Sequence, residues 1–186
     1  MTPLYELWLP VILSAALVFV VSSVLHMFTP WHKTDFEKIP NESRVLDALR
    51  PFAIPPGNYM APRADSMEHM RTPEFKEKYR TGPVILLTVC PSGNLSMVRN
   101  LVGWFVYCCV VGLFAGGIAG SALGKGAPYL AVFHFVSLTA FAGYALALWQ
   151  ASIWLHRAWL TTIKSTVDGL LFALLTGGVF GWLWPH

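Results

Sequence analysis

The sequence predicts an all-α membrane protein: a four-helix transmembrane bundle with a small mixed α/β element between spans one and two. Three observations predict it. The 186 residues are 55% apolar and 12% charged, with a mean hydropathy of +0.53, whereas a soluble domain carries about twice that share of charge. Four apolar runs are each long enough to cross about 30 Å of hydrocarbon. Nine of the thirteen Lys and Arg residues lie together between the first two runs.

The first span is expected within residues 1–28. Leu7 to Phe28 is apolar except for three serines and His26, and Pro10 falls in its first turn, where a missing N–H matters least. No Lys or Arg precedes the run, whereas a signal peptide needs a basic beginning and a small-residue cleavage site. We therefore expect this stretch to be retained as a span.

Residues 29–96 are expected to form a folded cytoplasmic element rather than a disordered linker. Asn41 is placed to cap a short helix that ends at Arg50, and Thr72-Pro73-Glu74 has the composition of a second helix start. Residues 83–90 are typical of a short buried strand, and residues 57–61 are its nearest candidate partner. The segment is therefore predicted to be mixed α/β.

The remaining three spans are expected within residues 97–186. Their predicted ranges are 97–123, 128–155 and 167–184, with Asn94 or Ser96 as the N-cap of the first of them. Gly124-Lys125-Gly126 is expected to make a tight connection, and Arg157 to Lys164 a short basic one. Asp168 then falls at the start of the last span, where an acid stabilises the helix dipole.

Glycines recur every fourth residue in two of these spans. Such a spacing places them on one face of a helix, where small side chains let a second helix approach closely. We expect a packing role, within the bundle or against a partner, and the alternative is a pore or gating helix. The residues concerned are Gly112, Gly116, Gly120, Gly124, Gly177 and Gly181.

The distribution of charge predicts the orientation of the chain. If the first loop and the connection between spans three and four share a side, that side holds twelve of the thirteen basic residues, and the other side keeps only Lys125. The positive-inside rule then places residues 29–96 in the cytoplasm and both termini outside.

Three histidines are candidate cofactor ligands. His26 and His156 fall at the same ends of spans one and three, and two such imidazoles are able to hold a haem. His134 lies inside span three, where an ionisable group is a candidate for pigment ligation; hydrogen bonding to Ser137, to Tyr144 or to a neighbouring helix is the favoured explanation. The sequence assigns no cofactor.

The residues give little support for catalysis, for a disulfide framework or metal site at the cysteines, or for nucleic-acid binding. His32 and Asp35 are spaced to hydrogen-bond, but no nucleophile accompanies them, so no catalytic residue is predicted. The three cysteines, Cys90, Cys108 and Cys109, predict neither a disulfide framework nor a metal site. A net charge of +3 gives no reason to expect nucleic acid as a partner.

Three short motifs resemble those of a known group of proteins. Pro55-Pro56-Gly57-Asn58-Tyr59-Met60, Gly82-Pro83-Val84 and Trp104-Phe105 are similar to the P-P-G-x-Y-M loop, the strand start and the second span of a family of uncharacterised bacterial integral (inner) membrane proteins. The resemblance covers about residues 10 to 123. It implies a bacterial inner-membrane location and no particular activity.

The sequence as a whole favours a non-enzymatic integral membrane protein. We expect an accessory or structural subunit that contacts the lipid bilayer and packs, through its glycine faces, against other membrane subunits or itself. The alternatives are a haem- or pigment-binding redox subunit that uses His26 and His156 or His134, and a small transporter or channel.

Overall fold

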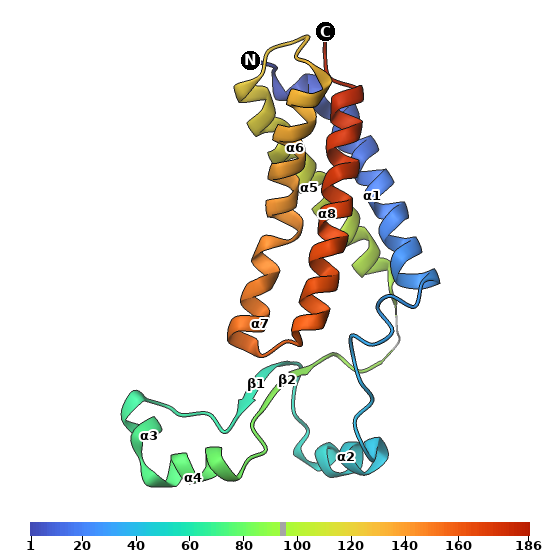
Figure 1. Ribbon diagram of the computed structural model, residues 1–186. Helices are drawn as coiled ribbons and strands as arrows, with labels where there is room; N and C mark the ends of the chain where they lie inside the picture. Colours follow the sequence, from blue (N-terminus) through green and yellow to red (C-terminus); the bar gives the residue numbers. More distant parts are fainter. Residues whose placement is uncertain (94–95) are drawn as a thin grey trace. The chain divides into compact units, whose positions relative to one another are not determined.

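The protein was analysed as a computed structural model that describes residues 1–93 and 96–186 (Figure 1). Four helical stretches are long and apolar enough to cross a membrane: Leu4–Phe28, Val98–Ala122, Tyr129–Leu155 and Trp159–Trp182. A small two-stranded sheet lies between the first and second of them in the sequence. The predicted fold class is confirmed.

The bundle is one compact unit made of Met1–Glu37 and Ser96–His186. Its helices are α1 (Trp8–Phe28, preceded by the 3₁₀ turn η1, Leu4–Leu7), α5 (Val98–Ala122), α6 (Tyr129–Tyr144), η3 (Leu146–Leu148), α7 (Trp149–Leu155) and α8 (Trp159–Trp182). Helix α6 packs along α8, α5 packs against α1 and α6, and α1 also contacts α8. Small and β-branched side chains dominate the core between them, which includes Ala15, Val18, Ala115, Ala119, Val132, Val136, Ala140 and Ala173.

The third span is interrupted, whereas the sequence predicted one continuous helix. Helix α6 ends at Tyr144, and Ala145 leaves the helical region with φ −123° before the chain continues through η3 into α7. Ala145 is fully buried, and a Cβ at Gly169 of α8 would lie 2.9 Å from the Cβ of Ala145. The break therefore falls at a point where α8 packs closely against this span.

The fourth span begins earlier than predicted. Helix α8 starts at Trp159, so the expected connection from Arg157 to Lys164 is mostly helix. Two hydroxyl side chains that directly follow this connection are satisfied inside the helix: Ser165 donates to the Thr161 carbonyl at 2.9 Å, and Thr166 to the Thr162 carbonyl at 2.8 Å. A hydroxyl that donates to the carbonyl four residues earlier needs no water. The polar residues therefore did not mark the start of α8.

Both termini lie at one end of the bundle, beside the connection between α5 and α6 (Figure 1). The Thr2 amide donates to the Gly120 carbonyl at 2.8 Å, and the Gly126 amide donates to the Pro185 carbonyl at 2.8 Å. Lys125 forms an ion pair with Glu6 at 2.6 Å. The first connection and the connection between α7 and α8 begin at the other end.

The segment Lys38–Leu95 forms a second compact unit. Its elements are α2 (Glu42–Leu49), η2 (Arg50–Phe52), β1 (Gly57–Ala61), α3 (Met67–Arg71), α4 (Pro73–Thr81) and β2 (Ile85–Val89). The two strands pair antiparallel, with Gly57 opposite Val89 and Ala61 opposite Ile85, which confirms the predicted pairing.

The structure confirms one of the predicted helix caps, at Thr72. Thr72 caps α4, because its hydroxyl accepts from the Phe75 amide at 3.2 Å. Asn41 precedes α2 in the left-handed conformation, with φ 52°, and its side chain makes no cap hydrogen bond. Met97, rather than Ser96, is the residue that precedes α5, and Asn94 lies outside the described residues.

Candidate functional site

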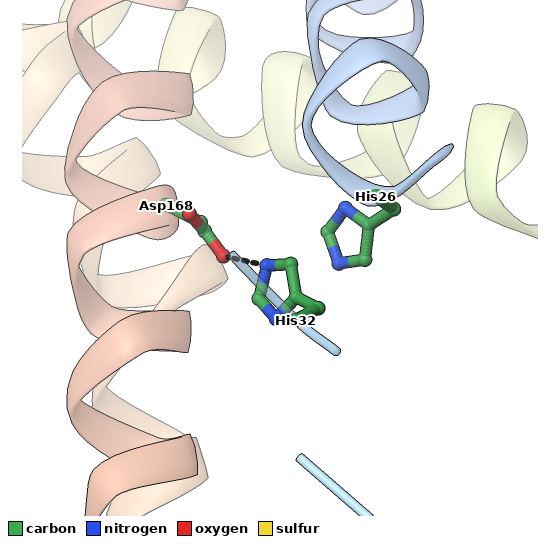
Figure 2. A group of neighbouring side chains, drawn as sticks. All are labelled: His26, His32 and Asp168. Carbon is green, nitrogen blue, oxygen red and sulfur yellow. Dashed lines mark ion pairs between the residues drawn. The ribbon is translucent and has the colours of Figure 1, made fainter. Parts of the chain in front are cut away.

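A cluster of ionisable side chains lies at the end of the bundle opposite the termini. His26 comes from the last turn of α1, His32 from the connection that follows it, and Asp168 from the third turn of α8. One potential ligand atom from each of the three lies within 4.8 Å of the other two. Figure 2 shows the His32 ring between His26 and the Asp168 carboxylate. Three separate segments of the chain therefore converge at this point.

His32 is held by a carboxylate at each nitrogen. Its Nδ1 lies 2.7 Å from Asp35 Oδ2 and forms a hydrogen bond with it, and its Nε2 lies 2.8 Å from Asp168 Oδ2. The second contact is short but poorly aligned: Nε2 is buried and has no hydrogen-bond partner among the described residues. The His32 ring also stacks on the His26 ring, with centroids 4.0 Å apart and planes 10° apart. The imidazole is thus oriented on three sides.

Asp168 is buried and is oriented by the indole of Trp31. Its side chain accepts the Trp31 Nε1–H at Oδ1 over 3.0 Å, which leaves Oδ2 facing His32. The sequence predicted Asp168 to be a helix-dipole acid at the start of the last span. That prediction is wrong, because α8 begins at Trp159 and Asp168 lies more than two turns inside the helix.

Lys164 and Asp35 form the outer part of the cluster. The Lys164 ammonium donates to Thr34 Oγ1 at 2.8 Å and to Asp35 Oδ1 at 3.4 Å, and it lies 5.7 Å from the centre of the Trp31 ring. Burial raises the pKa of Asp35, but hydrogen bonds from His32 and Lys164 outweigh burial, and the net effect lowers that pKa. Asp35 therefore stays ionised at neutral pH.

His26 is more exposed than His32. Its Nδ1 contacts the Ser22 carbonyl at 2.9 Å, so this nitrogen is the protonated one in the neutral ring and Nε2 carries the free lone pair. A groove of about 260 Å³ runs beside it, lined by residues of α1 and α5 that include Ser22, Met27 and Trp104. The groove gives a small solute a path to His26.

The other two candidate histidines lie apart from this cluster. His156 ends α7 in the left-handed conformation with φ 53°, and it is not among the residues grouped with His26. His134 is exposed on α6, with the Phe133 ring 6.0 Å away. Within the described part of the chain, His134 has no hydrogen bond to Ser137 or Tyr144.

The spaced glycines mostly face other helices of the same chain. A Cβ at Gly116 would lie 2.7 Å from the Phe180 ring, one at Gly120 would lie 2.5 Å from the Thr2 carbonyl oxygen, and one at Gly177 would collide with Ser137 Oγ. Gly181 faces the Tyr129 ring at 2.7 Å, and Gly112 has ordinary contacts with α1. Gly124 is the exception, with only the Met1 nitrogen at 4.0 Å.

Sequence reasoning identified the His32–Asp35 pair but not its partners. Lys164 and Asp168 were assigned to a connection and to a helix start, and neither assignment suggested a contact with the first loop. The sequence contained one indication of this contact. Trp31, His32 and Asp35 come immediately after span one, and the predicted topology places them at the same end of the bundle as Lys164 and Asp168.

Comparison with protein-family models, with curated proteins and with solved structures finds no match. The class of the protein therefore depends on its own sequence and fold. Four apolar helices of 24 to 27 residues define a multi-pass membrane protein in contact with the lipid bilayer.

Proposed function

We propose that this chain is a non-enzymatic accessory subunit of a bacterial inner-membrane complex, and that the unit Lys38–Leu95 docks another protein. The observation that carries the proposal is the surface of this unit. Among its described residues Phe75 is the only buried large apolar side chain, while many others are exposed. A folded element that leaves so much apolar surface uncovered gains stability when a partner covers it.

The strand pair is the strongest part of that surface. Met60 and Leu86 are register partners, so they share one face, and they are 43% and 45% exposed. An isolated two-stranded hairpin is at best marginally stable in water. The sheet order is β1-β2, so each strand also has one edge without a neighbouring strand in the described part of the chain. Such edges accept a strand from another protein.

The docking proposal predicts that charges on the hairpin release a partner. The double variant Met60→Glu, Leu86→Glu should lose proteins that co-purify with the wild-type chain in a mild detergent. A photo-crosslinking residue in place of Tyr59, in an otherwise wild-type chain, should link the chain in cells to the protein that co-purifies with it. Phe52→Glu is the matched control, because Phe52 is 72% exposed in the same unit but lies outside the strands. A wild-type chain that crosslinks only to lipid would contradict the proposal.

The proposal places residues 29–96 in the cytoplasm and both termini outside. Support comes from the arrangement of charges, because Lys125 pairs with Glu6 close to the N-terminus, whereas Lys164 contacts Thr34 in the connection that follows α1. The positive-inside rule then orients the bundle.

Cysteine labelling tests this orientation. Cys90 is exposed, so with Cys108 and Cys109 replaced by alanine it is a natural single label. A membrane-impermeant maleimide should fail to modify Cys90 in intact cells and should modify it after permeabilisation. Lys125→Cys in a cysteine-free chain should be modified in intact cells. Equal labelling of both positions from outside would contradict the orientation.

The glycine contacts favour packing over a pore. A Cβ at Gly116 or Gly177 would collide with atoms of a neighbouring helix of the same chain, and one at Gly120 would collide with the Thr2 carbonyl oxygen, just before the first helical turn. Close contacts of this kind are the usual means of helix association in lipid. The partner surface of this protein is therefore assigned to the unit Lys38–Leu95 rather than to the glycine faces.

A further inference from the structure

We propose that His26, His32 and Asp168 form a binding site for a divalent first-row transition-metal cation such as Zn²⁺. The proposal is independent of the docking function. It depends on which atoms of the three side chains are already engaged, on which atoms remain free, and on how close the free atoms lie to one another.

Each of the three side chains has one polar atom engaged and another one available. His26 uses Nδ1 on the Ser22 carbonyl, His32 uses Nδ1 on Asp35, and Asp168 uses Oδ1 on the Trp31 indole. The remaining atoms are His26 Nε2, His32 Nε2 and Asp168 Oδ2. Metal-ligating histidines almost always donate their second ring N–H to a carbonyl or a carboxylate. The partners of His26 and His32 are of these two kinds.

The buried Nε2 of His32 gives a second, independent indication. It has no hydrogen-bond partner among the described residues, although it lies 2.8 Å from Asp168 Oδ2. A buried polar atom without a partner is costly, and here the nearest oxygen lies off the direction of the ring nitrogen. A cation between the two atoms would take the lone pair of a neutral His32 and the charge of Asp168 together.

The spacing of the donors suits a small cation. Donors about 2.0–2.1 Å from a tetrahedral Zn²⁺ lie about 3.3 Å from one another. The ligand atoms of the three residues lie within 4.8 Å of one another, and the closest pair lies at 2.8 Å. The His26 ring stacks on the His32 ring with the two planes 10° apart, so the His26 side chain must turn out of this stack before both Nε2 lone pairs reach one cation, and its exposure leaves room for that turn.

The chemistry of the donors selects the class of cation. Two imidazoles and one carboxylate suit Zn²⁺, Fe²⁺, Co²⁺ or Ni²⁺, whereas Mg²⁺ and Ca²⁺ prefer oxygen donors throughout. Asp35 and Lys164 belong to the outer shell: Asp35 holds the His32 ring, and Lys164 holds Asp35 through a contact of 3.4 Å. The groove beside His26, lined by Met27, Asn100 and Trp104 among others, provides the entry path.

The test uses the full-length chain, purified in detergent through a tag without histidine, with Co²⁺ as the probe. Wild-type protein should bind one Co²⁺ per chain and show the visible absorption bands of a nitrogen- and oxygen-ligated cation, and excess Zn²⁺ should displace it. His26→Ala should weaken binding at least 10- to 100-fold, the range seen when even an outer-shell partner is lost. His26 is exposed and takes no part in the ion pairs of His32, so this variant should fold normally.

His156→Ala is the matched control, since it removes another histidine outside the cluster and should leave binding unchanged. Asp35→Asn should weaken Co²⁺ binding about 10- to 100-fold without removing a ligand. The proposal is overturned if wild-type protein shows no saturable Co²⁺ binding, or if His26→Ala and His156→Ala bind Co²⁺ alike. Either result would leave the cluster as a structural ion-pair network only.

Discussion

Gly177→Ala is expected to destabilise the bundle strongly, although it adds only one methyl group. The new Cβ would collide with Ser137 Oγ and would lie 2.9 Å from the Phe133 carbonyl oxygen. Because that carbonyl belongs to the backbone of α6 and cannot turn aside, α6 and α8 must separate. Overpacking of this kind costs about 1–3 kcal/mol. Reversible unfolding in mixed micelles, followed by tryptophan fluorescence, measures the loss.

The adjacent residue provides the control. A Cβ at Gly178 would meet only the Tyr129 hydroxyl at 3.7 Å, an ordinary contact. Gly178→Ala should therefore be neutral or should stabilise by up to about 1 kcal/mol, because alanine is the better helix former. Equal stability of the two variants would show that α6 and α8 do not approach each other closely at Gly177.

Asp168→Leu is expected to have the second large effect. It leaves the Trp31 indole N–H and the His32 imidazole without their shared partner in a buried place. A buried polar group left without its partner costs about 1–3 kcal/mol, and this variant leaves two such groups. Asp168→Asn keeps an acceptor for Trp31 and should cost less, about 1–3 kcal/mol. Unfolding should be measured with a chelator present, so that any bound cation makes no contribution.

A surface carboxylate serves as the comparison for Asp168. Asp47 of α2 pairs with Arg50 of η2, but both side chains are more than 60% exposed. Asp47→Asn should change the free energy of unfolding by less than about 1 kcal/mol, as is usual for exposed ion pairs. If Asp168→Leu cost no more than Asp47→Asn, the cluster would have no structural role.

Much of the fold was predictable because the bilayer imposes simple rules. Span length follows from hydrocarbon thickness, and apolar runs of more than twenty residues leave few alternatives. The strand pairing was also predictable, because Gly57–Ala61 and Ile85–Val89 are the two short runs bounded by turn residues. The start of α8 was not predictable in this way, because Thr162 and Ser165 are typical of a polar connection yet satisfy their hydroxyls within the bundle.

The site was harder to predict than the fold, because its residues belong together only through helix packing. His32 and Asp35 are neighbours in sequence, and their contact follows from spacing alone. Asp168 lies 136 positions after His32, and its contact depends on how far α8 extends before it reaches the end of α1. That extent depends in turn on where α8 begins, and only three residues, 156–158, join it to α7.

The contacts of Trp31, Thr34 and Asp35 with α8 fix the point from which the chain leaves the bundle towards Lys38. A mechanical load applied by a bound protein to residues 38–95 would therefore reach Lys164 and Asp168 before it reached the rest of α1. A cation bound by His26, His32 and Asp168 would stiffen the same anchor, because His32 lies between Trp31 and Thr34 in the sequence.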